Sequence, residues 1–176
     1  MRASGLGSTT FLDPDKAAAD IRAAHPALTE TAANFAGLRL VLQEVCRCLA
    51  GQESFVTETV LANSAYRRIC TDARASGWRV HLLYVGVPTV EDAIARVKLR
   101  IAKGGHAVRE ADIRRRWPRS HANLAWFARH ADAVEVIANT WDALPKLIAS
   151  ARAGRVELLD PVTLPAVTCV LQPLTS

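Results

Sequence analysis

A basic segment holds the residues of this sequence best suited to chemistry. Residues 96–130 contain ten Lys and Arg side chains against two acidic ones, a local charge of +8, whereas the whole chain carries +5. Arg96 and Arg100 are four residues apart, so on a helix their guanidinium groups lie on one face. Guanidinium groups bind phosphoryl oxygens in bidentate geometry and neutralise their charge. The segment therefore predicts a cationic lid over a phosphate group, with a solvated helical face as the alternative.

Paired glycines divide this basic segment. Gly104 and Gly105 separate two helical runs and predict a hinge between them. Three consecutive arginines, 114–116, spread around the second run, so at least one of them should point back across the hinge. His106 directly follows the glycines and is the histidine whose sequence context most favours ligand binding.

Two acidic positions could complement the arginines. Glu58 ends an apolar strand and is followed by Thr59, so its carboxylate either binds sugar hydroxyls or simply reaches solvent. Asp13 and Asp15 flank Pro14 at the start of a predicted helix, where either of them could be the N-cap with proline at the first helical position. The functional alternative makes Asp15 a general base that takes a proton from a substrate hydroxyl.

Other chemistries are not indicated. The sequence GLGSTT at residues 5–10 lacks the lysine and the preceding strand of a phosphate-binding loop. The cysteines lack the spacing of a zinc site and the histidines are scattered, so we expect no metal site and four reduced thiols. These cysteines are Cys46, Cys48, Cys70 and Cys169.

Length and composition predict one globular domain spanning residues 1–176. The chain is 50% hydrophobic, which is sufficient for a core. It has neither 18 consecutive apolar residues nor an apolar secretion signal near its start, so we expect a cytoplasmic protein that does not enter membranes.

Helical and strand periodicities alternate and predict an α/β fold. We expect a parallel sheet with helices on both faces, in which ligands bind beyond the carboxyl ends of the strands. Glu58 and Thr59 lie at one such end, and Asn139 and Thr140 at another. The expected helices are 14–24, 31–50, 63–76, 89–103, a run from 110 that Pro118 ends or kinks before a further turn to 130, and 141–151. The expected strands are 54–60, 78–87 (buried on both faces), 133–138 and 155–159, followed by a proline-containing tail in a loop or at a sheet edge.

Residues 54–124 resemble the zeta-toxin-like group of P-loop ATPases and kinases. The resemblance depends on the FVTET stretch at 55–59, the GGH triplet at 104–106 and the RR..RS..NL pattern at 115–124. Residues 12–21 resemble the acidic motif after the family's second strand, and residues 138–160 are similar to its C-terminal strand, helix and short strand. The resemblance implies a P-loop kinase-like parallel sheet flanked by helices, and ATP-dependent phosphotransfer with Mg²⁺.

The same resemblance assigns roles on the acceptor side. The acceptor would be a small hydroxyl compound such as a UDP-linked amino sugar. Asp15 would be the catalytic base, and Glu58 with Thr59 would hold the acceptor. An antitoxin protein is an implied partner.

On the phosphate side, Arg100 with Arg115 or Arg116 would stabilise the transferring group. Arg96 and His106 complete the predicted substrate-binding residues.

The chain departs from the family because the first strand and the phosphate-binding loop are absent. That strand would lie between the strand ending at Glu58 and strand 78–87, so both neighbours would expose an edge and destabilise the sheet or favour self-association. We therefore expect either that the true start lies upstream of Met1 or that the chain is an N-terminally truncated remnant. In both cases we expect poor affinity for ATP and impaired or absent kinase activity. One alternative is a non-catalytic basic module that binds nucleic acid or another polyanion, although the resemblance disfavours nucleic acid. Another is a degenerate protein without a biochemical role, which would be expressed poorly in soluble form.

Overall fold

The computed structural model describes residues 9–105 and 107–175. They form α/β structure in two compact units, Met1–Thr59 and Val60–Ser176, which we describe separately as the N-terminal and C-terminal units. None of the helices within the described ranges is both long enough and apolar enough to cross a membrane.

The N-terminal unit combines two short parallel strands with two helices. β1 (Thr10–Leu12) pairs with β2 (Phe55–Thr57), and α1 (Pro14–Ala24) packs against α2 (Glu30–Gly51). The predicted start of α1 is confirmed: Oδ1 of Asp13 accepts hydrogen bonds from the amides of Asp15 at 2.8 Å and Lys16 at 3.2 Å, with Pro14 at the first helical position.

A glycine allows α1 and α2 to approach closely. A Cβ atom on Gly37 would lie 2.6 Å from the backbone nitrogen of Ala18 and 2.9 Å from the carbonyl oxygen of Pro14. The helices therefore contact each other through backbone atoms at this position, and a side chain there would force them apart.

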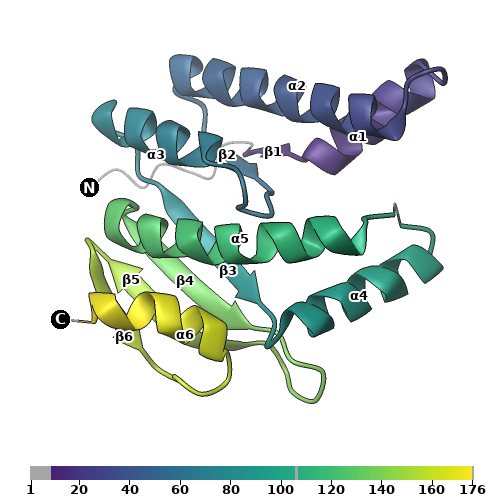
Figure 1. Cartoon of the computed structure of the whole chain (residues 1–176). Helices are drawn as coiled ribbons and strands as arrows, with labels where there is room; N and C mark the ends of the chain where they lie inside the picture. The colour runs from purple at the N-terminus through teal and green to yellow at the C-terminus, as the bar shows by residue number, and fades with distance from the viewer. Residues whose placement is uncertain (1–8, 106, 176) are drawn as a thin grey trace. The chain divides into compact units, whose positions relative to one another are not determined.

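The C-terminal unit contains a mixed sheet of four strands in the order β3-β4-β5-β6 (Figure 1). β3 pairs with β4 in parallel, whereas β4–β5 and β5–β6 are antiparallel, so the predicted all-parallel sheet is wrong for the last two strands. The elements of this unit are α3 (Ala65–Ala75), β3 (His81–Gly86), α4 (Val90–Ala102), α5 (Glu110–His130), β4 (Ala133–Ala138), β5 (Lys146–Arg152), β6 (Arg155–Leu158), α6 (Pro165–Leu171) and the 3₁₀ turn η1 (Gln172–Leu174).

Two C-terminal predictions are wrong because nonlocal pairing decides the structure. The predicted helix 141–151 is largely strand β5, which forms a hairpin with β6 through Ala153 and Gly154, both at positive φ. Positive φ at both central residues is typical of the tight turns that join twisted antiparallel strands. The predicted loop or edge segment contains helix α6, in which Pro165 occupies the start, where proline is tolerated.

Helix α5 continues through Pro118, so of the two expectations for this residue, an end or a kink of the helix, the end is wrong. A proline inside a helix costs roughly 3 kcal/mol through the lost hydrogen bond and steric conflict. The buried face of α5 offsets this cost, because Leu124 and Phe127 are 0% and 5% exposed in the core.

Helices cover one face of the four-stranded sheet. Figure 1 shows α5 and α6 on the same side, where Val134 and Val136 of β4 are buried. On the opposite face Leu83 and Val85 of β3 are 62% and 56% exposed, so the prediction that this strand is buried on both faces is wrong. We call this uncovered side the open face.

In the part of the chain that the structure describes, four strands have a neighbour on one side only: β1 and β2 in the N-terminal unit, and β3 and β6 in the C-terminal unit. Among the described residues, β2 pairs with β1 and β3 pairs with β4, and neither has a second partner. This agrees with the expectation that the strand ending at Glu58 and the strand after Trp78 each expose an edge.

The four cysteines are free thiols. Cys48 and Cys70 are buried, whereas Cys46 on α2 and Cys169 on α6 are exposed. Burial raises the pKa of the Cys70 thiol to about 11.

Candidate functional site

The predicted arginines of α4 line an open pocket of about 500 Å³ in the C-terminal unit. One wall lies beside the carboxyl end of β4, because Trp141 follows that strand and Arg96 donates to Asn139, the first residue after it. Ligands usually bind at the carboxyl ends of strands in α/β proteins. We call this cavity the α4 pocket. Its lining residues are Arg96, Leu99, Arg100, Lys103, Gly104, Gly105 and Trp141.

Neutral groups hold Arg96 in place. Its Nη2 donates hydrogen bonds to the backbone oxygen of Asn139 at 2.8 Å and to its Oδ1 at 3.2 Å. Its guanidinium carbon lies 4.5 Å from the ring centroid of Trp141, in a cation–π contact. The buried Nε of Arg96 has no hydrogen-bond partner among the described atoms. Among the residues that the structure describes, the guanidinium group of Arg96 thus has no salt bridge, although its charge contributes to lowering the pKa of Asp92 one turn earlier on α4.

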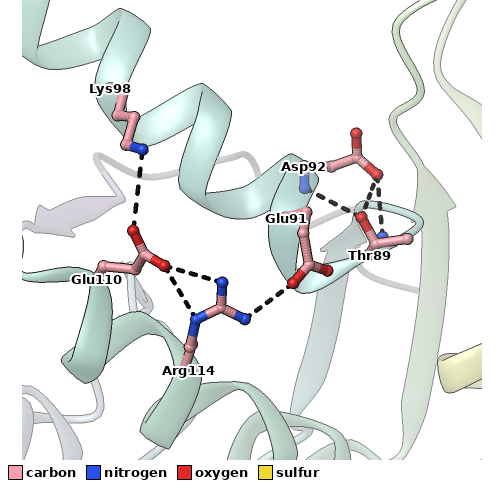
Figure 2. Close-up of polar contacts among 6 residues, drawn as sticks. All are labelled: Thr89, Glu91, Asp92, Lys98, Glu110 and Arg114. Carbon is pink, nitrogen blue, oxygen red and sulfur yellow. Dashed lines mark hydrogen bonds and ion pairs between the residues drawn. The ribbon is translucent and has the colours of Figure 1, made fainter.

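The start of α4 positions Trp141 in turn. Trp141 Nε1 donates to Oδ1 of Asp92 at 2.8 Å. The other oxygen of Asp92 accepts from the backbone amide of Thr89 at 3.1 Å, and Thr89 Oγ1 accepts from the amide of Asp92 at 3.1 Å (Figure 2). This reciprocal capping confirms the predicted helix start. Hydrogen bonds from Thr89 and then Trp141 lower the pKa of the Asp92 carboxyl.

The paired glycines shape the wall beside Arg100. Gly104 has φ of +90°, which favours glycine and ends α4. The amide of Gly105 donates to the backbone oxygen of Arg100 at 2.9 Å, and a Cβ on Gly105 would lie 2.7 Å from Arg100 Cγ. The predicted break is confirmed as a helix end, whereas His106 lies outside the described residues.

Arg114 joins α5 to α4 (Figure 2). Its Nη1 lies 2.8 Å from Glu91 Oε1, and its Nη2 lies 2.8 Å from Glu110 Oε1. One of the three consecutive arginines therefore does point back across the hinge, as expected. These carboxylates neutralise its charge and raise the pKa of Arg114, so its role here is to connect the two helices.

Arg115 and Arg116 do not line the α4 pocket. Arg115 Nη2 lies 2.6 Å from Asp112 Oδ1, and Arg109 Nε lies 2.8 Å from the other oxygen of the same carboxylate. Arg116 is exposed on α5. The structure thus gathers two of the predicted phosphate-site arginines, Arg96 and Arg100, and leaves this second pair on the adjoining helix.

The predicted acidic residues belong to the N-terminal unit. β1 and β2 are parallel, with Leu12 level with Thr57, and the amide of Glu58 donates to the backbone oxygen of Leu12 at 3.3 Å. The segments that begin at Asp13 and Glu58 therefore leave the same end of this small sheet. Asp15 is exposed in the first turn of α1, and Glu58 and Thr59 are exposed directly after β2.

Two residues of the RR..RS..NL motif have structural roles that sequence reasoning missed. Asn123 is 4% exposed; its Nδ2 donates to the backbone oxygen of Leu61, and its Oδ1 accepts from Arg67 Nε at 2.6 Å. Ser120 Oγ lies 3.2 Å from the hydroxyl of Tyr84 on β3. The available signal was the spacing, because polar residues at 120 and 123 share the helical face of apolar Leu124.

A buried histidine on α5 predicts a pH-dependent stability. His121 is 4% exposed and packs 4.7 Å from the ring of Trp117; burial lowers its pKa from 6.5. Its contribution to stability is therefore fully present above about pH 6.5 and is lost as the pH falls through the lower folded-state pKa. Urea unfolding at pH 7.5 and pH 5 should show the wild type losing more stability on acidification than His121→Asn. Equal losses in the two proteins would contradict this assignment.

Within the described ranges, no three His, Cys, Asp or Glu side chains gather as metal ligands would. The described His, Cys, Asp and Glu side chains therefore do not fit a dedicated metal site.

Comparisons with known proteins give a partial sequence match and no family assignment. No protein family and no solved structure matches the chain. A Haemophilus influenzae protein described as uncharacterized is 39% identical over 59 residues. The matched stretch is 34% of this chain and spans 41% of the length of that relative.

Proposed function

We propose that the chain is a zeta-toxin-like phosphotransferase domain that uses ATP with Mg²⁺ and a small hydroxyl acceptor, such as a UDP-linked amino sugar. One contrast supports this proposal most directly. Arg96 is oriented by an amide and an indole ring, whereas Arg114 and Arg115 are paired with carboxylates. The α4 pocket thus retains positive charge beside the carboxyl end of β4, where an anionic ligand would bind.

In this proposal the α4 pocket binds phosphate. Arg100 and Lys103 contact phosphoryl oxygens from the exposed part of the pocket, and the guanidinium group of Arg96 adds positive charge to the same wall. Arg115 and Arg116 are the alternative partners of Arg100, and Arg115 would first have to leave Asp112.

The acceptor side belongs to the N-terminal unit. Asp15 takes the proton from the acceptor hydroxyl, and Glu58 and Thr59 bind neighbouring hydroxyls. Mg²⁺ would arrive bound to ATP and reduce the charge of its phosphates. Because ATP and nucleotide sugars occur in the cytoplasm, the proposal includes a cytoplasmic location. An antitoxin that blocks the site is the implied protein partner.

Binding measurements test the phosphate site. In isothermal titration we expect MgATP and inorganic tripolyphosphate to bind weakly, in the millimolar range, and Arg100→Ala to weaken both by about tenfold, or about 1.4 kcal/mol. Lys98→Ala is the matched control, because Lys98 is an exposed cation on the same helix that faces Glu110 at 3.8 Å instead of the pocket. Equal losses in the two variants would indicate nonspecific charge attraction and refute the site. Micromolar binding of MgATP would refute the expected weak affinity.

Two further measurements separate phosphotransfer from polyanion binding. Transfer of labelled γ-phosphate from ATP to a UDP-linked amino sugar should be lost in Asp15→Asn, while its binding of MgATP remains unchanged. Tight binding of single-stranded RNA that weakens steeply with salt and with each arginine removed would favour the basic-module alternative instead.

A further inference from the structure

The free edge of β3 is the least protected surface of the sheet. Strand edges present unpaired N–H and C=O groups, and proteins usually shield them with charges, prolines, bulges or short length. β3 has six residues, HLLYVG, with regular pairing to β4 and with neither proline nor a Lys, Arg, Asp or Glu side chain. The other edge of the same sheet, β6, has four residues and includes Arg155 and Glu157. One edge of the sheet is thus shielded, and the other is not.

The backbone of β3 shows which groups this edge presents. The carbonyl oxygens of Val80 and Gly86 accept hydrogen bonds from the side of β4, through the amides of Asp132 and Asn139. Because successive residues in a strand direct their backbone groups to opposite sides, Leu83 and Val85 direct theirs away from β4. The side chains of these two residues also project from the open face of the sheet, where they are more than half exposed. Apolar side chains and unpaired backbone groups therefore coincide at the same two positions.

We propose that two copies of this chain pair along β3, antiparallel about a two-fold axis, so that their four-stranded sheets become one continuous sheet. A two-fold axis makes identical strands antiparallel, and the same edge then serves both copies. Leu83 and Val85 of the two copies become cross-strand neighbours on the open face and shield one another from water. No charged side chain of β3 opposes this contact, because His81 is its one titratable residue besides Tyr84. This inference does not depend on the proposed enzymatic function.

Sedimentation velocity over a range of concentrations tests the pairing. The full-length wild type should sediment as a reversible dimer at tens of micromolar, and Leu83→Lys should shift it to monomer by placing two ammonium groups beside each other at the contact. Leu147→Lys is the matched control: Leu147 is 38% exposed on the open face but lies on β5, two strands away from the edge. Val56→Lys on β2 is the second control, because Val56 is 50% exposed on another strand that has a neighbour on one side only. Both controls should remain dimeric.

Hydrogen exchange provides a readout that does not depend on a variant. The amides of Leu83 and Val85 should become protected as the protein concentration rises, whereas those of Leu82 and Tyr84, which face β4, should be protected at every concentration. A wild type that is monomeric at 100 μM and above would overturn the proposal. So would a dimer that Val56→Lys or Leu147→Lys dissociates and Leu83→Lys does not. A dimer without concentration-dependent protection in residues 81–86 would also overturn it.

Discussion

Gly37→Ala should lower the free energy of unfolding of the N-terminal unit by about 2 kcal/mol, against the ordinary trend for this substitution. In an open helix alanine is about 1 kcal/mol better than glycine. At position 37 the added methyl group would overlap the backbone of α1, 2.6 Å from Ala18 N and 2.9 Å from Ala18 Cα. Backbone atoms cannot rotate away as side-chain ends do, so α1 and α2 must separate, and overpacking of this kind costs roughly 1–3 kcal/mol or more.

The positions of the tryptophans make this prediction specific to one unit. All four, at 78, 117, 126 and 141, lie in the C-terminal unit. In a urea titration of Gly37→Ala, circular dichroism at 222 nm should therefore show an earlier loss of helix, while the tryptophan fluorescence transition stays in place. Gly51→Ala is the control, because the atoms nearest to its Cβ would belong to the flexible Glu53 side chain, at 3.3 Å and beyond. A Gly37→Ala protein as stable as Gly51→Ala would show that the two helices do not touch as described.

Asn123→Ala should destabilise the C-terminal unit by about 2 to 3 kcal/mol. The change removes the donor to the buried carbonyl of Leu61 and the acceptor for Arg67 Nε. A buried polar group left without a partner costs roughly 1–3 kcal/mol, and hydrogen bonds to charged groups are at the upper end of this scale. Leu61 has φ of +54°, so this amide also stabilises an unusual backbone turn ahead of α3. In a urea titration of Asn123→Ala, the unfolding transition followed by tryptophan fluorescence should therefore shift to a lower urea concentration.

A double-mutant cycle with Arg67→Ala tests whether the two residues act together. If the hydrogen bond at 2.6 Å contributes as described, the double variant should be less destabilised than the sum of the single ones, with a coupling of about 1 kcal/mol. Arg68→Ala is the matched control: Arg68 is the neighbouring arginine, its side chain is 88% exposed, and its Nε lies 3.5 Å from Asp72 Oδ2 in a surface ion pair. It should change stability by less than about 0.5 kcal/mol. Additive effects of Asn123→Ala and Arg67→Ala would contradict the proposed link.

Local chemistry made several parts of the fold predictable. Asp13 with Pro14, and Thr89 with Asp92, begin helices where the sequence indicates, because capping involves residues within one turn. Residues 146–152 were misassigned for the opposite reason. Their strand conformation depends on pairing with β4 and β6, and an Ala- and Leu-containing stretch does not show that pairing by itself.

The candidate site likewise contains residues that local sequence predicts and a contact that it does not. Helical spacing was enough to place Arg96 and Arg100 on one wall, and the end of a strand was enough to single out Asn139. The contact between Arg96 and Trp141 joins elements far apart in the chain, so no local pattern indicates it. The net charge of residues 96–130 did not show which arginines lie in the pocket, because Glu91 from outside this segment neutralises Arg114.

The distribution of thiols makes the unmodified chain suitable for spectroscopic labelling. Cys46 and Cys169 are exposed, one in each unit, while burial shields Cys48 and Cys70 and keeps the Cys70 thiol protonated at neutral pH. A maleimide spin label or a donor–acceptor dye pair should therefore attach at these two exposed positions without engineered cysteines. Electron–electron double resonance or energy transfer between the labels would then measure the distance between Cys46 and Cys169 in solution.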